Sequence, residues 1–139
     1  MIPASFQSLI ADYQSLENPR EKFQFLLELS EELPEIDSAK KTPECAVKGC
    51  ASNAWVAVNR DTEGKIHISG AAEAQISKGM LAFFSLGLSG CTPQEVLLIT
   101  DEELENTGVI TSLSPSRANG ALSTWKKIHH TALSFYGQK

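Results

Sequence analysis

Apolar residues near the amino terminus recur every three or four positions. They fall within residues 5–16, at Phe6, Leu9, Ile10, Tyr13 and Leu16. This spacing places side chains on one face of a helix. The pattern therefore predicts a first helix over residues 5–16.

A helix start follows at once. Asn18 can cap free backbone amides, Pro19 is tolerated in a first helical turn, and Glu21 stands where a capping box has its acid. A second helix is expected from here to about Leu33, because Pro34 cannot continue it.

The helical spacing of apolar residues ends in the middle of the chain. Residues 35–44 are polar and carry no sustained pattern, which predicts a connecting loop. Residues 55–58 are strand-like, residues 61–65 are rich in turn formers, and residues 66–69 alternate between apolar and polar. An antiparallel hairpin is the expected structure.

The second half of the chain reads as helical. Residues 73–88 are apolar nearly all round, which predicts a central buried helix whose end is marked by Gly87 and Gly90. A short helix should follow Thr92, residues 101–105 should form a weak turn, and residues 114–135 should form the last helix. The order predicts one α+β domain over residues 1–139, in which several helices pack on a small antiparallel sheet of about three strands.

Composition and charge exclude some classes of protein, such as nucleic-acid-binding and membrane-spanning proteins. The 139 residues carry a hydrophobic fraction of 42%, enough for one core, and a net charge of −5 without a basic cluster. Nucleic acid is therefore not an expected partner. No signal peptide and no apolar run long enough for a membrane span are apparent, so a cytoplasmic protein with no membrane partner is expected. The three cysteines suit a reducing compartment better than a disulfide framework.

The candidate chemistry lies just before the first expected strand. Cys50 follows Gly49, with Lys48 before the pair and the polar Ser52 after it. Glycine lets the backbone approach another molecule closely, and a nearby lysine favours the reactive thiolate weakly. A thiol in this setting suits a cysteine that must reach into another protein's site, although buried cysteines often act only as small apolar fillers.

Other uses of the cysteines stay open. Cys45 and Cys50 have the C-x4-C spacing that could begin a zinc or cluster site, with further ligands to be sought among His67, His129 and His130. A cysteine–histidine nucleophile has no local signature here. Cys91 lies between a helix-ending glycine and the next helix, where packing is the expected role.

Two segments together resemble the SufE family, which includes the CsdE proteins. The first is Val47-Lys48-Gly49-Cys50-Ala51-Ser52-Asn53-Ala54-Trp55, and the second is Leu113-Ser114-Pro115-Ser116-Arg117-Ala118-Asn119-Gly120. The stretch Glu73-Ala74-Gln75-Ile76-Ser77-Lys78-Gly79 resembles the start of that family's long helix. The match spans nearly the whole chain. It departs at Glu73, where the family more usually has aspartate, and at Cys45 and Cys91, which match no family role.

The resemblance implies a sulfur carrier for iron–sulfur cluster assembly. Cys50 would accept persulfide sulfur from a cysteine desulfurase of the SufS or CsdA type, stimulate that enzyme, and pass the sulfur to a downstream scaffold or acceptor. Pyridoxal phosphate would belong to the desulfurase, and no cofactor or metal is expected in this chain. Such a protein is a sulfur acceptor rather than a self-contained turnover enzyme. An alternative is a docking module that activates the desulfurase without carrying sulfur.

Arg117 is the next candidate after Cys50. A guanidinium at a helix start interacts poorly with the helix dipole, which favours an outside contact or a bound carboxylate over a role in the helix itself. Asn119 is expected to shape the same corner. The residues predicted to bind the partner or support the cysteine loop are Lys48, Gly49, Ser52, Glu73, Arg117 and Asn119.

Overall fold

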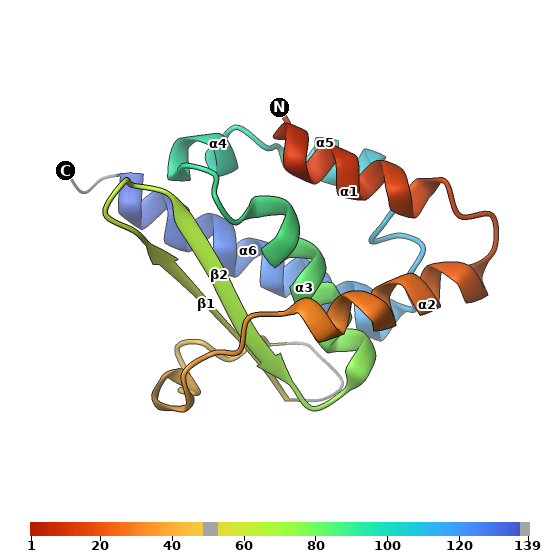
Figure 1. The fold of residues 1–139 in the computed structure, drawn as a ribbon, viewed down its shortest axis with the longest axis horizontal. Helices are drawn as coiled ribbons and strands as arrows, with labels where there is room; N and C mark the ends of the chain where they lie inside the picture. Colours follow the sequence, from red (N-terminus) through yellow and green to blue (C-terminus); the bar gives the residue numbers. More distant parts are fainter. Residues whose placement is uncertain (49–52, 137–139) are drawn as a thin grey trace.

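The computed structural model describes residues 1–48 and 53–136. Within these ranges, six α-helices and two strands follow one another in an α+β order (Figure 1). The elements are α1 (Ala4–Gln14), α2 (Pro19–Leu29), β1 (Ala54–Arg60), β2 (Ile66–Ala72), α3 (Gln75–Leu88), α4 (Pro93–Leu97), α5 (Asp101–Asn106) and α6 (Pro115–Tyr136). Two single-turn 3-10 helices, Ser30–Glu32 and Ser38–Lys40, lie between α2 and β1.

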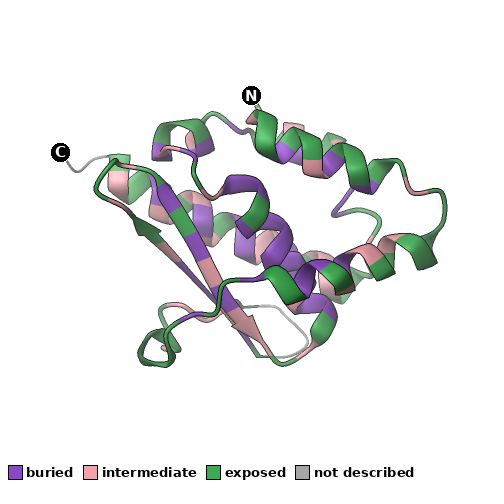
Figure 2. Cartoon of the chain, viewed as in Figure 1, coloured by how far each residue is buried: buried purple, intermediate pink, exposed green. Residues whose placement is uncertain are grey.

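Helix α3 lies at the centre of the molecule. It packs against β2 on one side and against α1 and α2 on the other, while α6 runs beside it and packs against β1 (Figure 1). Most of the residues of α3 are buried, as the apolar sequence of residues 73–88 predicts (Figure 2). One continuous hydrophobic cluster joins side chains from all of these elements.

The two strands form an antiparallel hairpin. Ala54 pairs with Ala72 at one end and Arg60 pairs with Ile66 at the other. Ile66 and Ile68 are buried while His67 between them is exposed, because successive strand residues point to opposite faces. The expectation of about three strands is close: two strands form among the described residues, and isolated bridges at Glu35–Gly70 and Ala46–Trp55 extend the pairing.

Two glycines let the other helices approach α3 closely. A Cβ atom on Gly79 would lie 2.2 Å from the carbonyl oxygen of Leu26 in α2, and one on Gly87 would lie 2.2 Å from the ring of Phe6 in α1. The expectation that Gly87 helps to end the helix is therefore wrong. Gly87 is a buried packing position inside α3, and Gly90, with a φ of 91°, follows the helix end.

Other boundaries differ modestly from the predictions. Helix α2 ends at Leu29 and continues as the 3-10 turn Ser30–Glu32 before Pro34. Residues 101–106 form helix α5 rather than a weak turn. The reason is a capping box, in which the Thr100 hydroxyl accepts from the Glu103 amide and the Glu103 carboxylate accepts from the Thr100 amide.

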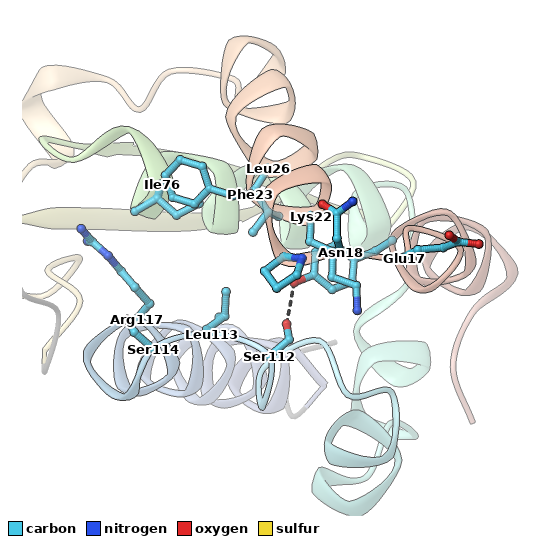
Figure 3. A pocket seen from close by; sticks show the side chains of 12 residues that line it. Glu17, Asn18, Lys22, Phe23, Leu26, Ile76, Ser112, Leu113, Ser114 and Arg117 are labelled. Carbon is cyan, nitrogen blue, oxygen red and sulfur yellow. Dashed lines mark hydrogen bonds between the residues drawn. The ribbon is translucent and has the colours of Figure 1, made fainter.

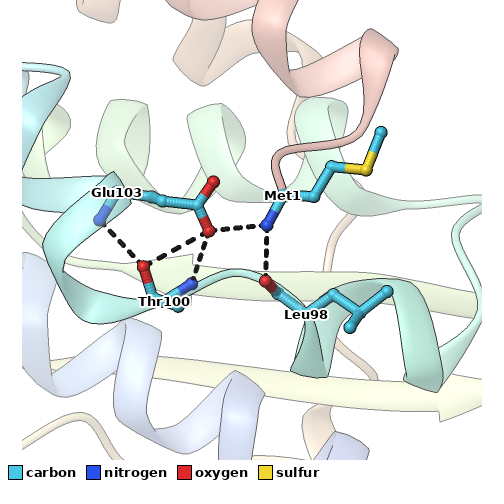
Figure 4. Close-up of polar contacts among 4 residues, drawn as sticks. All are labelled: Met1, Leu98, Thr100 and Glu103. Atoms are coloured by element: carbon cyan, nitrogen blue, oxygen red, sulfur yellow. Dashed lines mark hydrogen bonds and ion pairs between the residues drawn. The ribbon is translucent and has the colours of Figure 1, made fainter.

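The same carboxylate connects the chain's first residue to the α4–α5 region (Figure 4). The amino group of Met1 lies 2.6 Å from Oε1 of Glu103 and donates to the carbonyl oxygen of Leu98 at 2.5 Å. Hydrogen bonds from Met1 and Thr100 lower the pKa of Glu103 below its usual value. None of the helices within the described ranges combines the length and hydropathy of a bilayer-crossing segment.

Candidate functional site

The residues on either side of the Cys50 segment pair with each other. The amide of Val47 donates to the carbonyl oxygen of Ala54 at 2.8 Å, and the amide of Val56 donates to the carbonyl oxygen of Cys45 at 2.9 Å. The fold thus brings Val47 and Ala54 together at the end of the hairpin that β1 begins. Gly49, Cys50 and Ser52 lie outside the described residues, so their roles stay predictions.

Glu73 supports the flank that follows Cys50. Its backbone amide donates to the carbonyl oxygen of Asn53 at 2.9 Å, and its carboxylate accepts from the Asn53 amide at 3.3 Å. This reciprocal pair ties the start of β1 to the approach to α3. A carboxylate is a strong acceptor for a backbone amide, which gives the acidic side chain at position 73 a local reason besides any contact with a partner.

Arg117 turns toward α3. Its Nη1 atom donates a hydrogen bond of 2.8 Å to the hydroxyl oxygen of Ser77, a side chain that is only 7% exposed. Arg117 itself is half-buried. The arginine predicted for an outside contact therefore also has an internal contact, which holds its guanidinium beside the first turn of α3.

A small cavity with a mostly apolar lining adjoins this corner. Its volume is about 10 Å³, close to the least that one water molecule needs. Val47 and Ala54 from the two flanks of the Cys50 segment line it, together with the side chain of Arg117. The remaining lining residues come from α3 and α6: Ser77, Met80, Leu81, Gly120, Ala121 and Thr124.

Lys48 and Asn119 are both exposed. Lys48 comes directly after buried Val47, and Asn119 lies two positions after Arg117, which places it on a different face of α6. Neither side chain forms a hydrogen bond with another residue of the described ranges. The structure thus brings Glu73 and Arg117 to the flanks of the Cys50 segment, whereas the partner-binding roles of Lys48 and Asn119 stay predictions.

The other two cysteines differ from each other. Cys91 is 5% exposed and belongs to the hydrophobic core, as its expected packing role requires. Burial, together with the nearby charge of Glu95, raises the pKa of the Cys91 thiol, which disfavours the reactive thiolate. Cys45 is half-buried beside the segment. Within the described ranges no three histidine, cysteine or acidic side chains gather in a metal-binding group, and the suggested Cys45–Cys50 site involves a residue outside those ranges.

The sequence assigned no role to two residues of this corner, although both stand in segments that resemble the family. Ser77 is one of few polar residues in an otherwise apolar helix, and its partner Arg117 is 40 positions away. Asn53 contributes through its backbone, which its side-chain type does not reveal. Only the fold brings these residues together.

Known proteins resemble this chain over most of its length. Residues 7–132 match the SufE family, described as an Fe-S metabolism associated domain. The chain is 30% identical over 134 residues to a SufE-like protein of Synechocystis sp., covering 96% of this chain and 84% of that protein. It is 34% identical to SufE-like protein 1, chloroplastic/mitochondrial, of Arabidopsis thaliana, covering 95% of this chain but 36% of the plant protein.

A solved structure shows the same fold. The solution structure of a hypothetical protein from Thermus thermophilus has a TM-score of 0.82 with this chain, at 19% sequence identity, and the match covers 98% of both chains. The family match spans nearly all of the fold, including the paired flanks of the Cys50 segment. This chain belongs to the SufE family, whose domain is associated with iron–sulfur metabolism.

Proposed function

We propose that this chain accepts persulfide sulfur on Cys50 from a pyridoxal-phosphate-dependent cysteine desulfurase, stimulates that enzyme, and passes the sulfur on for iron–sulfur cluster assembly. The observation that carries the proposal is the placement of described residues where the two flanks of the Cys50 segment pair. The paired flanks Val47 and Ala54, the carboxylate of Glu73 and the guanidinium of Arg117 all meet at one corner of a SufE-family fold.

The transfer step needs no external oxidant. The Cys50 thiolate attacks the outer sulfur of the persulfide on the desulfurase cysteine, and a new sulfur–sulfur bond forms. The bond between the outer sulfur and the donor cysteine breaks, and the donor leaves as a thiolate. The outer sulfur keeps its oxidation state, so the step is an exchange between two cysteines.

The neighbouring charges suit this exchange. Both the attacking group and the leaving group are thiolates, and a thiolate is stabilised by a nearby cation. Arg117 supplies a positive charge, and its hydrogen bond to Ser77 holds the guanidinium at the corner. Exposed Lys48 adds a second positive charge two positions before Cys50.

The small cavity beside the Cys50 flanks offers a resting position for the carried sulfur. A persulfide is easily oxidised or reduced in solution, so a carrier benefits from shielding it between transfers. The apolar cavity lined by Val47 and Ala54 adjoins both flanks of the Cys50 segment. We expect the sulfur of Cys50 to shelter there and to leave the cavity when the partner binds.

Mass spectrometry after incubation with a desulfurase and cysteine tests the proposal. A reductant-labile gain of one sulfur should appear on the peptide that contains Cys50. The Cys45→Ser and Cys91→Ser variants serve as matched controls, and both should gain sulfur as the natural chain does. Sulfur found only on Cys45 or Cys91, or on no cysteine, would contradict the proposal.

A further inference from the structure

A second, much larger cavity lies beside the start of α6. It has a volume of about 590 Å³ and opens between two segments far apart in the sequence, residues 17–26 and residues 112–117 (Figure 3). Pockets that bind small molecules commonly have volumes of about 300–1,000 Å³. The cavity is therefore large enough for a compact organic ligand.

One wall of the cavity is apolar, and part of it is exposed rather than buried in the core. Leu26 and Ile76 are buried and contribute to its lining, and Leu113 faces them from the opposite segment (Figure 3). Phe23 also lines it, yet its side chain is 51% exposed. An exposed aromatic ring next to buried aliphatic side chains is a surface that an apolar group can cover favourably.

Two cations border the same cavity. Lys22 and Arg117 line it, and neither forms an ion pair with a residue of the described ranges. The ammonium of Lys22 lies 5.4 Å from the centre of the Tyr13 ring. One acid, Glu17, lies at the opposite end of the cavity from Arg117 (Figure 3). A chain with a net charge of −5 thus has a locally cationic, partly apolar cavity.

We propose that this cavity binds a small organic carboxylate with an aromatic or branched aliphatic body. The apolar body covers Phe23, Leu26 and Ile76, and the carboxylate interacts with the ammonium of Lys22, with the charge of Arg117 adding to the positive potential. A hollow with a buried floor favours a small molecule over a flat protein surface. The site extends beyond sulfur acceptance, because Lys22 and Phe23 take no part in that proposal.

Binding of 3-phenylpropionate to the full chain tests the inference directly. Amide chemical shifts are recorded during a titration at neutral pH, with 3-phenylpropan-1-ol as the uncharged analogue. We expect saturable shifts confined to residues 17–26, 76 and 112–117, and binding of the alcohol at least about tenfold weaker, because a charge-assisted contact is lost.

Two variants and one control sharpen the test. Lys22→Gln and Phe23→Ala should each weaken binding of the carboxylate by roughly tenfold. Lys126→Gln, which removes an exposed lysine in the middle of α6 that does not line the cavity, should bind as the natural chain does. Circular dichroism of each variant confirms that the chain is folded before binding is compared.

Three results would overturn the inference. The first is the absence of saturable shifts up to the solubility limit of the carboxylate. The second is equal binding of the alcohol and the carboxylate, which would make the cavity a non-specific apolar surface. The third is a cavity that does not bind the carboxylate but becomes protected when a desulfurase is added, which would assign it to protein docking instead.

Discussion

The interior around α3 and the corner at its first turn are built on different principles. In the interior, α1 and α2 cross α3 at glycines, and the fit depends on volume. At the corner, the contacts are one or two hydrogen bonds between positions far apart in the chain, such as Arg117 with Ser77 and Glu73 with Asn53. A change of side-chain size in the interior should therefore lower the stability of the fold. A substitution at the corner should change stability little but impair function.

The largest effect on stability is expected at the α2–α3 crossing. Gly79→Ala places a methyl group 2.2 Å from the backbone oxygen of Leu26, which cannot move as a flexible side chain would. Overpacking of this kind should lower the free energy of unfolding by about 2 kcal/mol, after the better helix propensity of alanine is counted. Chemical denaturation measures this free energy of unfolding. Lys78→Ala, one position earlier in α3, is the control and should change stability little.

A stable Gly79→Ala variant would show that α2 can shift away from α3. It would weaken the claim that the interior is fixed by volume, and the contrast with the corner would lose its basis.

Arg117→Ala should affect function far more than folding. Loss of the hydrogen bond to Ser77 should cost about 1 kcal/mol of stability, while stimulation of the desulfurase should fall by roughly tenfold at limiting concentration of the variant. Desulfurase turnover is measured against the concentration of each variant. Arg60→Ala is a matched control, because Arg60 also donates one hydrogen bond, to the carbonyl oxygen of Phe135 near the other end of α6.

Equal loss of stimulation in the Arg60→Ala and Arg117→Ala variants would contradict a special role for the corner. Full stimulation by Arg117→Ala at every concentration would remove Arg117 from the proposed site.

Glu73→Ala should have a smaller effect than Arg117→Ala. It should weaken the hydrogen bonding of Asn53, on the flank that follows Cys50. The Asn53 amide loses its carboxylate acceptor, so its hydrogen exchange should accelerate by about tenfold, which corresponds to roughly 1.4 kcal/mol. Glu73→Gln keeps an oxygen acceptor and should preserve most of the protection. Exchange at Asn53 that is the same in all three proteins would mean that the carboxylate does not hold this flank.

The smallest effect is expected at the exposed turn of the hairpin. A hydrogen bond from His67 and backbone hydrogen bonds lower the pKa of Asp61 below its usual 3.8. A carboxylate whose pKa is lowered by folding stabilises the fold above its unfolded value, and this contribution disappears as the pH falls through the folded value. The melting temperature of Asp61→Asn should thus lie slightly below that of the natural chain near neutrality.

The two melting temperatures should converge as the pH falls from 3.8 through the lower pKa of Asp61 in the folded chain, because both side chains are uncharged below that value. A difference that stays constant or grows at low pH would show that Asp61 acts through something other than its charge.

The sequence predicted the helices and the hairpin well because their signals are local. The caps at Asn18 and Thr92 begin α2 and α4, and the alternation around His67 marks a strand with one buried face. Where local signals conflict with packing, the prediction failed. Gly87 resembles a helix end but fills a close contact with Phe6, which is 81 positions away.

The corner was predicted only in part, for a related reason. Family resemblance pointed to Glu73 and Arg117, but their internal partners Asn53 and Ser77 lie 20 and 40 positions away in the sequence. A single sequence has no local pattern that records such pairs. The cavity beside Phe23 escaped notice because it forms between two segments that only the folded chain brings together.

Replacement of Cys50 by serine tests the central claim most directly. Serine keeps the size of the side chain but cannot form a persulfide, so the carrier account predicts that the folded Cys50→Ser variant gains no sulfur. It also predicts that the variant fails to raise desulfurase turnover, although it still binds the enzyme. Full stimulation by Cys50→Ser, with no sulfur adduct on the natural chain, would contradict the carrier account and favour a docking module.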